Sequence, residues 1–261
     1  YRRKNAADIT VHHYEDGTTT ELYSPTGGTA SAVTISGAGK LGLTENLTNQ
    51  AANIANFEYA SVDISGAPSA TSPSSTGATT LTHGTAAQTV IYKYKRKDAG
   101  NVIVKYVEQG TNTPLKAQVT LSGAGKLGLP YTTTPDNFTN YDLVSATPTG
   151  HTGNYPPAGN DITVTYEYRR KNAGNITVNH YEVGGSTQLY TPTGAAGPSA
   201  ESFNGTGKLG LSENLTNKAA NINNYEFVSV DVSGASGAST PNAAGDTTVT
   251  YVAGPQTVTY R

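Results

Sequence analysis

Alternating apolar and polar positions open three segments of the chain. In the first segment Ile9, Val11 and His13 share one face, and a period of two is the pattern of a half-buried strand. The inward positions of the other two segments are Val102, Val104, Tyr106, Ile176, Val178 and His180. Similar alternation returns further along, at Val90, Tyr92, Tyr94, Val164, Tyr166, Tyr168, Val258 and Tyr260. The pattern predicts three units that each begin and end in a strand, with these two strands adjacent.

Three short motifs recur in a fixed order and divide the chain into repeats. The basic motif Tyr-Arg-Arg-Lys-Asn-Ala at 1–6 returns in related form at 94–99 and 168–173. A Gly-Lys-Leu-Gly-Leu motif closes the segments 36–43, 122–129 and 204–211. The third motif, Asn-Phe-Glu-Tyr at 56–59, has counterparts at 140–143 and 224–227. The order predicts tandem repeats at 1–97, 98–171 and 172–261.

Further elements are expected between the outer strands of each repeat. Leu47, Ala51 and Ile54 have helical spacing behind a possible Thr44 cap, which predicts a short helix, and 212–222 repeats the pattern. A third strand is expected near 57–64, 141–146 and 225–232, and a surface loop at 67–78. Two strand-like runs around Gly254-Pro255 predict an added hairpin.

The outer repeats are longer than the middle one because both carry an insertion with related sequence. The insertions read Leu-Tyr-Ser-Pro-Thr-Gly at 22–27 and Leu-Tyr-Thr-Pro-Thr-Gly at 189–194. Few residues separate the last strand of one repeat from the first strand of the next. These short links predict an extended, monomeric rod of β-dominated domains. An Ig-like sandwich is the alternative fold, although it needs about seven strands per repeat.

Composition excludes several classes of chemistry. The chain of 261 residues has no Cys, so disulfides, thiolate zinc sites and iron–sulfur clusters are excluded. The net charge of −2 gives no basic field that would favour nucleic acid. No apolar run is long enough to span a membrane, and no signal segment opens the chain. Because the chain begins and ends inside the repeated pattern, we expect it to be a piece of a longer protein.

The middle repeat resembles the MucBP (mucin-binding protein) repeats of Gram-positive surface adhesins. The resemblance rests on Gly-Asn-Val-Ile-Val-Lys-Tyr-Val at 100–107, Tyr-Thr-Thr-Thr-Pro at 131–135 and Asp-Ile-Thr-Val-Thr-Tyr-Glu-Tyr at 161–168. The outer repeats depart from it through their insertions and through His13 and His180, where the family has Tyr. The resemblance implies a ubiquitin-like β-grasp fold, a wall-anchored extracellular parent protein, and attachment to mucin glycoproteins or other host glycans.

The sequence offers no catalytic or metal-binding arrangement. Adjacent His12 and His13 point to opposite faces of a strand, so they cannot chelate one ion together. No nucleophile elbow or calcium loop appears. Gly37-Ala38-Gly39-Lys40 lacks the full spacing of a phosphate loop and favours a structural turn. We therefore expect a protein that is not an enzyme and has no cofactor.

Two sets of residues are candidates for ligand contact. Basic residues gather at every repeat junction: Arg2, Arg3, Lys4, Lys95, Arg96, Lys97, Arg169, Arg170 and Lys171. They could hold sialylated or sulfated glycans, or could be solvated strand ends that block edge pairing. Sugars could stack on the rings of Tyr23, Tyr190 and Tyr155, or these rings could cap small cores. The sequence thus leaves two functions open, a glycan-binding adhesin and a spacer that projects another domain.

Overall fold

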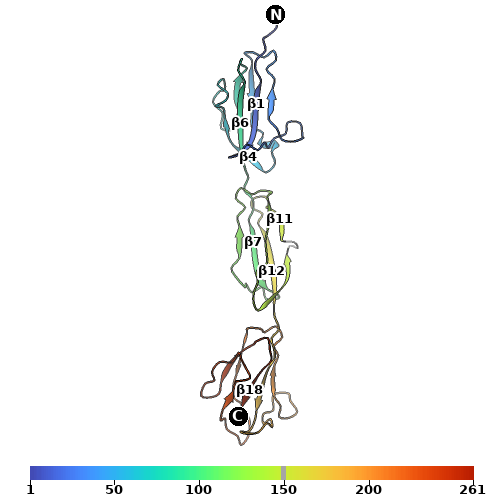
Figure 1. The fold of residues 1–261 in the computed structure, drawn as a ribbon, viewed down its shortest axis with the longest axis vertical. Coiled ribbons are helices and arrows are strands. Elements are labelled where there is room, and N and C mark those ends of the chain that lie inside the picture. The colour runs from blue at the N-terminus through green and yellow to red at the C-terminus, as the bar shows by residue number, and fades with distance from the viewer. Residues whose placement is uncertain (148–150) are drawn as a thin grey trace. The chain divides into compact units, whose positions relative to one another are not determined.

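The computed structural model describes residues 1–147 and 151–261 (Figure 1). The chain forms two compact units. The first comprises Tyr1–Val104, Val119–Thr133 and His151–Val164, and the second comprises Lys105–Gln118, Thr134–Gly150 and Thr165–Arg261. Residues of the middle repeat belong to both units, so the repeat boundaries at 97 and 171 stay a prediction.

In the first unit, residues 1–97 form a four-stranded sheet and a two-stranded ribbon. Their elements are β1 (Ile9–Glu15), β2 (Val33–Ile35), β3 (Thr44–Leu47), the 3₁₀ turn η1 (Ala51–Asn53), β4 (Phe57–Asp63), β5 (Thr79–Thr82) and β6 (Gln88–Arg96). The sheet has the order β2-β1-β6-β4, and β3 pairs with β5 in the ribbon. The central strands β1 and β6 are parallel and lie side by side (Figure 1).

The alternating positions form the core of this sheet. Ile9, Val11, Val90, Tyr92 and Tyr94 are all buried, as their period of two requires. Leu47 from the ribbon and Phe57 from β4 pack against them. Burying these apolar side chains is the main stabilising contribution that the repeat has without disulfides.

In the second unit, residues 172–261 repeat the same plan. The elements are β13 (Ile176–His180), β14 (Glu201–Phe203), β15 (Ser212–Leu215), the 3₁₀ turn η2 (Ala219–Asn221), β16 (Val230–Asp231), β17 (Thr247–Thr250) and β18 (Gln256–Tyr260). The sheet order is β14-β13-β18-β16, with β13 and β18 parallel. The third strand β16 covers two residues, whereas β4 covers seven.

The strands of the middle repeat are distributed over both units. They are β7 (Val102–Glu108), β8 (Val119–Leu121), β9 (Pro130–Thr132), β10 (Tyr141–Thr147), β11 (Thr152–Asn154) and β12 (Ile162–Arg170). The sheet order β10-β12-β7-β8 corresponds to that of the other two sheets, and β9 pairs with β11 in a ribbon.

The expected fold class is confirmed. In the first and third repeats the first and last strands form the central parallel pair of a mixed sheet, which is the β-grasp arrangement. The alternative Ig-like sandwich is not formed, because it would require two antiparallel sheets packed face to face. Among the described residues, no helix has the length and apolar character needed to cross a membrane.

Three expected elements are wrong: two short helices and one hairpin. Thr44–Leu47 is a strand paired with Thr79–Thr82, and only the 3₁₀ turn η1 follows it; 212–222 behaves likewise. The spacing of Leu47, Ala51 and Ile54 fits a helix, and it also fits a strand end followed by a turn. Tertiary pairing decides between these two structures. The expected hairpin around Gly254-Pro255 is absent, because β17 pairs with β15 while β18 pairs with β13 and β16.

Candidate functional site

The insertion of each outer repeat is held against the first strand by the same pair of backbone hydrogen bonds. Leu22 donates its N–H to the His13 carbonyl at 2.8 Å, and Leu189 donates to the His180 carbonyl at 2.8 Å. Ser31 and Ser199 then donate to the carbonyls of Tyr23 and Tyr190, both at 3.0 Å. These bonds fix each insertion tyrosine beside a histidine of the sheet.

Each of these tyrosines packs edge-on against its histidine. The ring centroids of His13 and Tyr23 are 5.0 Å apart at 63°, and those of His180 and Tyr190 are 5.1 Å apart at 60°. On its other side His13 stacks flat on Tyr92, and His180 stacks flat on Tyr260. Tyr23 and Tyr190 are therefore half-buried caps of the core that still reach the surface.

Burial favours the neutral form of both histidines. Desolvation lowers the pKa of His13 to about 4, although the Glu21 carboxylate acts in the opposite direction. The pKa of His180 is also lowered by burial, against the opposing effect of a hydrogen bond that its ring donates to the Glu201 carboxylate. An uncharged imidazole can stack on tyrosine rings without the cost of burying a charge.

In the middle repeat a lysine takes the place of the insertion tyrosine. Leu115 donates its N–H to the Tyr106 carbonyl at 2.9 Å, as Leu22 and Leu189 do in their repeats. The next residue, Lys116, places its Nζ 4.5 Å from the centroid of the Tyr106 ring. In this repeat the core is therefore capped by the Lys116 ammonium, which lies over the Tyr106 ring.

Grooves lie beside both insertion tyrosines. The groove of the third repeat has a volume of about 560 Å³, and its aromatic and polar lining residues are Tyr190, Thr191, Thr193, Asn221, Asn223 and Tyr225. The groove of the first repeat is smaller, about 190 Å³, and Tyr23, Asn46, Thr48 and Gln50 contribute to it. Rings beside amides and hydroxyls are the groups that a sugar needs for stacking and hydrogen bonding.

Tyr155 is placed differently from the other two candidate tyrosines. It is 7% exposed, and its ring packs edge-on against Tyr131 at 5.7 Å. The Lys126 ammonium lies 5.1 Å from its ring centroid. Tyr155 therefore packs inside the middle repeat, which corresponds to the core-capping alternative.

One arginine in each basic cluster is held by protein groups. The Arg96 guanidinium lies 4.4 Å from the centroid of the Phe57 ring and donates to the Leu127 carbonyl at 3.0 Å. At the next junction, Arg170 lies 4.5 Å from the Tyr141 ring centroid and donates to the Leu209 carbonyl at 3.3 Å. We call this arrangement of an arginine, an aromatic ring and a leucine carbonyl the arginine clasp.

The remaining basic residues are more accessible. Arg2, Lys4, Lys97 and Arg169 are exposed. Lys95 pairs with Glu58 at 3.0 Å, and Lys171 lies 3.8 Å from Asp142. Arg3 donates to the Leu41 carbonyl at 3.1 Å. The structure thus brings part of each predicted basic band into contact with the protein itself.

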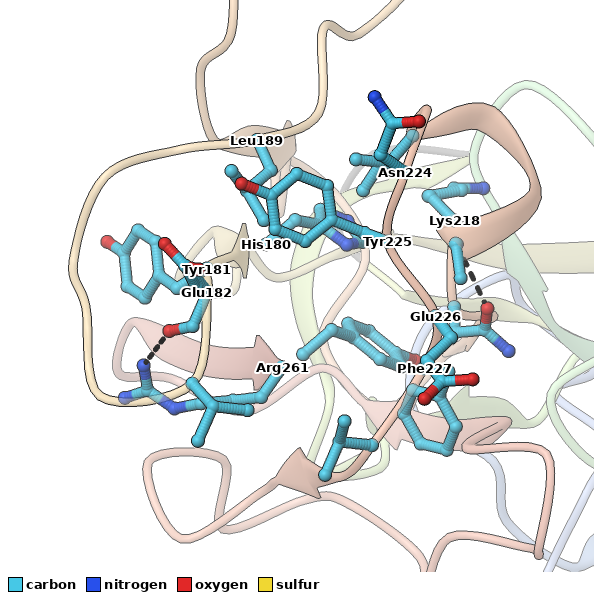
Figure 2. A pocket seen from close by; sticks show the side chains of 16 residues that line it. His180, Tyr181, Glu182, Leu189, Lys218, Asn224, Tyr225, Glu226, Phe227 and Arg261 are labelled. Carbon is cyan, nitrogen blue, oxygen red and sulfur yellow. Dashed lines mark hydrogen bonds between the residues drawn. The ribbon is translucent and has the colours of Figure 1, made fainter.

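A further pocket of about 370 Å³ lies in the third repeat, and Figure 2 shows the side chains around it. Its lining includes His180, Glu182, Tyr225, Glu226 and Phe227. These residues were not expected to form a site, although Tyr225, Glu226 and Phe227 belong to a recurring motif. Within the described part of the chain, no three His, Cys, Asp or Glu residues form a possible metal site.

Comparison with known families matches the MucBP domain to residues 101–169 and 175–261, which is more than half of the chain. Among characterised proteins, Internalin J of Listeria monocytogenes serotype 4b is 32% identical over 125 residues. That match covers 47% of this chain and 13% of Internalin J, so the chain corresponds to a small part of that protein.

Two solved structures are similar over different shares of the chain. The Bacillus anthracis TIE protein is 10% identical with a TM-score of 0.49, over 98% of this chain and 51% of that one. The type 2 repeat of the mucus binding protein MUB from Lactobacillus reuteri is 16% identical with a TM-score of 0.20, over 62% of this chain and 98% of that one.

Proposed function

Because the chain belongs to the MucBP domain family, we propose that it is the repeat region of a bacterial surface adhesin that binds mucin or other host glycans. The observation that carries the proposal is the groove of the third repeat, where Tyr190 and Tyr225 lie beside Asn221 and Asn223. The parent protein is then extracellular and anchored to the cell wall, as the resemblance to wall-anchored adhesins implies.

The chemistry of the groove suits a sugar. A tyrosine ring offers an apolar face with little conformational entropy to lose, and amides and hydroxyls can both donate and accept hydrogen bonds to sugar hydroxyls. A shallow groove of this kind binds weakly by itself. Two grooves in one chain, at Tyr190 and Tyr23, increase the avidity for a ligand that carries many glycans.

The test is binding of the whole chain to purified mucin and to a glycan array. The double variant Tyr23→Ala/Tyr190→Ala should weaken binding at least about tenfold, because each groove loses the ring of its insertion tyrosine. Tyr1→Ala is the matched control, since Tyr1 is exposed and lies outside both grooves. A double variant that stays folded by circular dichroism and binds as well as the parent chain would refute these grooves as the site.

Salt separates the grooves from the basic clusters. Stacking and neutral hydrogen bonds depend weakly on ionic strength, whereas contacts to sulfate or sialate weaken steeply as salt rises. Binding that survives 0.5 M salt supports the tyrosine grooves. Binding that is lost in salt, and lost in Lys97→Ala and Arg169→Ala, assigns the ligand to the basic residues.

The alternative function is a spacer that holds another binding domain away from the wall. The observation that favours it is the engagement of candidate ligand residues by the protein itself, as for Arg96, Arg170 and Tyr155. A chain that binds no mucin and no arrayed glycan at high protein concentration would make the spacer the better proposal.

A further inference from the structure

In the first repeat, a carboxylate of the chain itself bonds to the edge of the first strand. Glu21 accepts the backbone N–H of His13 at 3.0 Å through one of its oxygens. Its other oxygen lies 2.6 Å from Nδ1 of His12. A backbone N–H and a nitrogen-bearing side chain, on consecutive residues of β1, thus bind both oxygens of one carboxylate.

The third repeat has an amide at the equivalent position. Gln188 is the equivalent of Glu21, because each precedes the leucine whose N–H bonds to the carbonyl of the strand histidine. The oxygen of Gln188 accepts the His180 N–H at 3.1 Å, and its nitrogen donates to the Asn179 side chain at 2.7 Å. Both outer repeats therefore place a side-chain oxygen on the same backbone N–H.

The middle repeat has the same backbone arrangement without that oxygen. Leu115 bonds to the Tyr106 carbonyl, as the leucines of the outer repeats bond to their histidines, and the residue before it is Pro114. The N–H and the carbonyl of one strand residue point to the same side of the strand, so the Tyr106 N–H faces the segment that holds Pro114. A proline side chain has no oxygen, so it cannot accept this N–H as Glu21 and Gln188 do in their repeats.

A groove of about 490 Å³ lies at this position of the middle repeat. Its lining includes Lys105, Tyr106, Pro114, Gln118 and Thr165, and no Asp or Glu is among its described lining residues. The volume is within the range of small-molecule sites, about 300–1,000 Å³. Apolar surface beside a few polar groups is also the usual composition of such sites.

Lys105 is the cation that this groove offers to a ligand. It is the equivalent of His12, since each is the residue before the strand residue whose N–H faces the loop. Lys105 is exposed, and within the described part of the chain no acidic side chain forms an ion pair with it. The other lysine of the lining, Lys116, already pairs with Asp136 and lies over the Tyr106 ring. The groove therefore has an ammonium group and a backbone N–H on consecutive residues, and no carboxylate of its own.

We propose that the groove of the middle repeat binds the carboxylate of an acidic sugar, as the edge of β1 binds the carboxylate of Glu21. One carboxylate oxygen of the ligand accepts the Tyr106 N–H, and the other accepts a hydrogen bond from the Lys105 ammonium. The Gln118 amide and the Thr165 hydroxyl, which also line the groove, bond to hydroxyl groups of the same sugar. The choice of a carboxylate rests on the geometry of the first repeat, whereas the choice of a sugar as its carrier rests on the proposed function.

The test is an NMR titration of the whole chain with two sugars that differ only at the carboxylate. Methyl glucuronide carries a carboxylate where methyl glucoside carries a hydroxymethyl group. We expect the glucuronide to shift the amide signals of residues 105–107 and 115–118, and the glucoside to bind at least about tenfold more weakly, because it cannot pair with Lys105. If the two sugars shift these signals equally, or if the glucuronide shifts none of them, the proposal is overturned.

Variants at two positions of the groove make the test specific. Lys105→Gln should weaken binding of the glucuronide at least about tenfold, whereas Lys97→Gln, which removes an exposed lysine outside the groove, should not change it. Pro114→Glu should abolish binding, because the new carboxylate would occupy the place of the ligand as Glu21 does in the first repeat. Thr113→Glu is the matched control, since it adds the same charge at an exposed neighbouring position outside the lining and should keep most of the binding.

The remaining outcomes identify the occupant and separate this inference from the proposed function. If Lys97→Gln weakens binding as much as Lys105→Gln, or if Pro114→Glu binds the glucuronide as the parent chain does, the groove is not the site. N-acetylglutamate methylamide represents a carboxylate on a protein, and tighter binding of this compound than of the glucuronide would overturn the sugar as the occupant. The titration involves neither mucin nor the tyrosine grooves. A chain that binds mucin but no glucuronide would therefore overturn this inference and leave the proposed function intact.

Discussion

At the scale of the residue, one buried position in the first strand of each repeat holds histidine in the outer repeats and tyrosine in the middle repeat. His13 and His180 lie between tyrosine rings in the outer repeats, and Tyr106 stacks on Tyr166 at the equivalent position of the middle repeat. A buried imidazole performs the same packing as a phenol ring only while it is neutral. The outer repeats therefore acquire a dependence on pH that Tyr106 does not bring to the middle repeat.

We predict that His13→Tyr/His180→Tyr removes part of the acid sensitivity of the chain. The unfolded chain titrates near the ordinary His pKa of 6.5, while folding lowers the pKa of His13 to about 4. Between these values the unfolded state binds more protons, so stability falls as pH falls. The loss is on the order of 2 kcal/mol for such a residue. Urea denaturation at pH 7.0, 5.5 and 4.5 measures it.

Tyr106→His is the matched control, since it should add the same dependence to the middle repeat. Below pH 4.5 the carboxylates also titrate, among them Glu45, whose pKa is lowered by its hydrogen bond with His83. The comparison is therefore restricted to the window above that pH. If the free energies of unfolding of the parent chain and of the double variant fall in parallel as pH drops below 6.5, the role given to the histidines is contradicted.

Residue burial was largely predictable, while residue partners were not. The period of two correctly placed Ile9, Val11 and His13 on the buried face. The clasp of Arg96 was not predictable, because its ring is 39 positions away and its carbonyl acceptor 31 positions away. Only the folded sheet brings them together.

At the scale of the element, the glycine-rich motif acts as a structural turn, as its incomplete phosphate-loop spacing indicated. Lys40 donates its N–H to the Gly37 carbonyl at 3.0 Å, and Lys126 and Lys208 donate to Gly123 and Gly205 in the same way. The first glycine of each motif lies against the start of the repeat. A Cβ on Gly123 would be 2.3 Å from the Gly100 carbonyl oxygen, and Gly37 and Gly205 are equally confined.

We predict that Gly123→Ala destabilises the middle repeat by about 3 kcal/mol, because its Cβ meets backbone that cannot move aside without breaking the Ala99–Gly123 hydrogen bond. Gly125→Asn is the control in the same turn. Gly125 has a φ of 63° and open space around a Cβ, and asparagine tolerates that conformation. Thermal unfolding should show a large shift for Gly123→Ala and a small one for Gly125→Asn. If the two variants lower the melting temperature equally, then the close approach of neighbouring backbone to Gly123 is not the reason why glycine is needed there.

Element type was predictable where the period was long and ambiguous where it was short. The strands of seven or nine residues at β1, β4 and β6 were expected from the sequence. The segment 44–54 has three apolar residues whose spacing fits a helix. However, its first part, Thr44–Leu47, forms its backbone hydrogen bonds with Thr79–Thr82 in a two-stranded ribbon. That pairing joins segments more than 30 residues apart, which local spacing cannot reveal.

At the scale of the whole molecule, the recurring motifs predicted three related sheets, and the structure has them. What the sequence did not predict is that two of its motifs meet. The basic motif at the end of one sheet contacts the Gly-Lys-Leu-Gly motif that follows it, through Arg96 and Leu127 in the first unit and through Arg170 and Leu209 in the second. In tandem repeat proteins such neighbour contacts set how strongly adjacent repeats stabilise each other.

We predict that Arg96→Ala loosens the contact between residues 96–97 and Leu127. The guanidinium is planar, covers the Phe57 ring and donates to the Leu127 carbonyl, so its loss exposes the adjacent bond from the Leu127 N–H to the Lys97 carbonyl. Amide hydrogen exchange of Leu127 should become at least about tenfold faster. The Tyr92 amide, in the middle of β6, should keep its protection, which distinguishes local opening from unfolding.

Two further variants make this prediction specific to the clasp. Lys97→Ala removes an exposed neighbouring charge but keeps the carbonyl that Leu127 bonds, so its exchange should match the parent chain. Arg96→Lys keeps the charge and loses the planar fork, so it should behave like Arg96→Ala. If Arg96→Lys retains full protection of Leu127, positive charge alone holds the junction and the ring contributes nothing. If Lys97→Ala is as damaging as Arg96→Ala, the basic motif acts through its total charge, and arginine is not the residue that joins consecutive repeats.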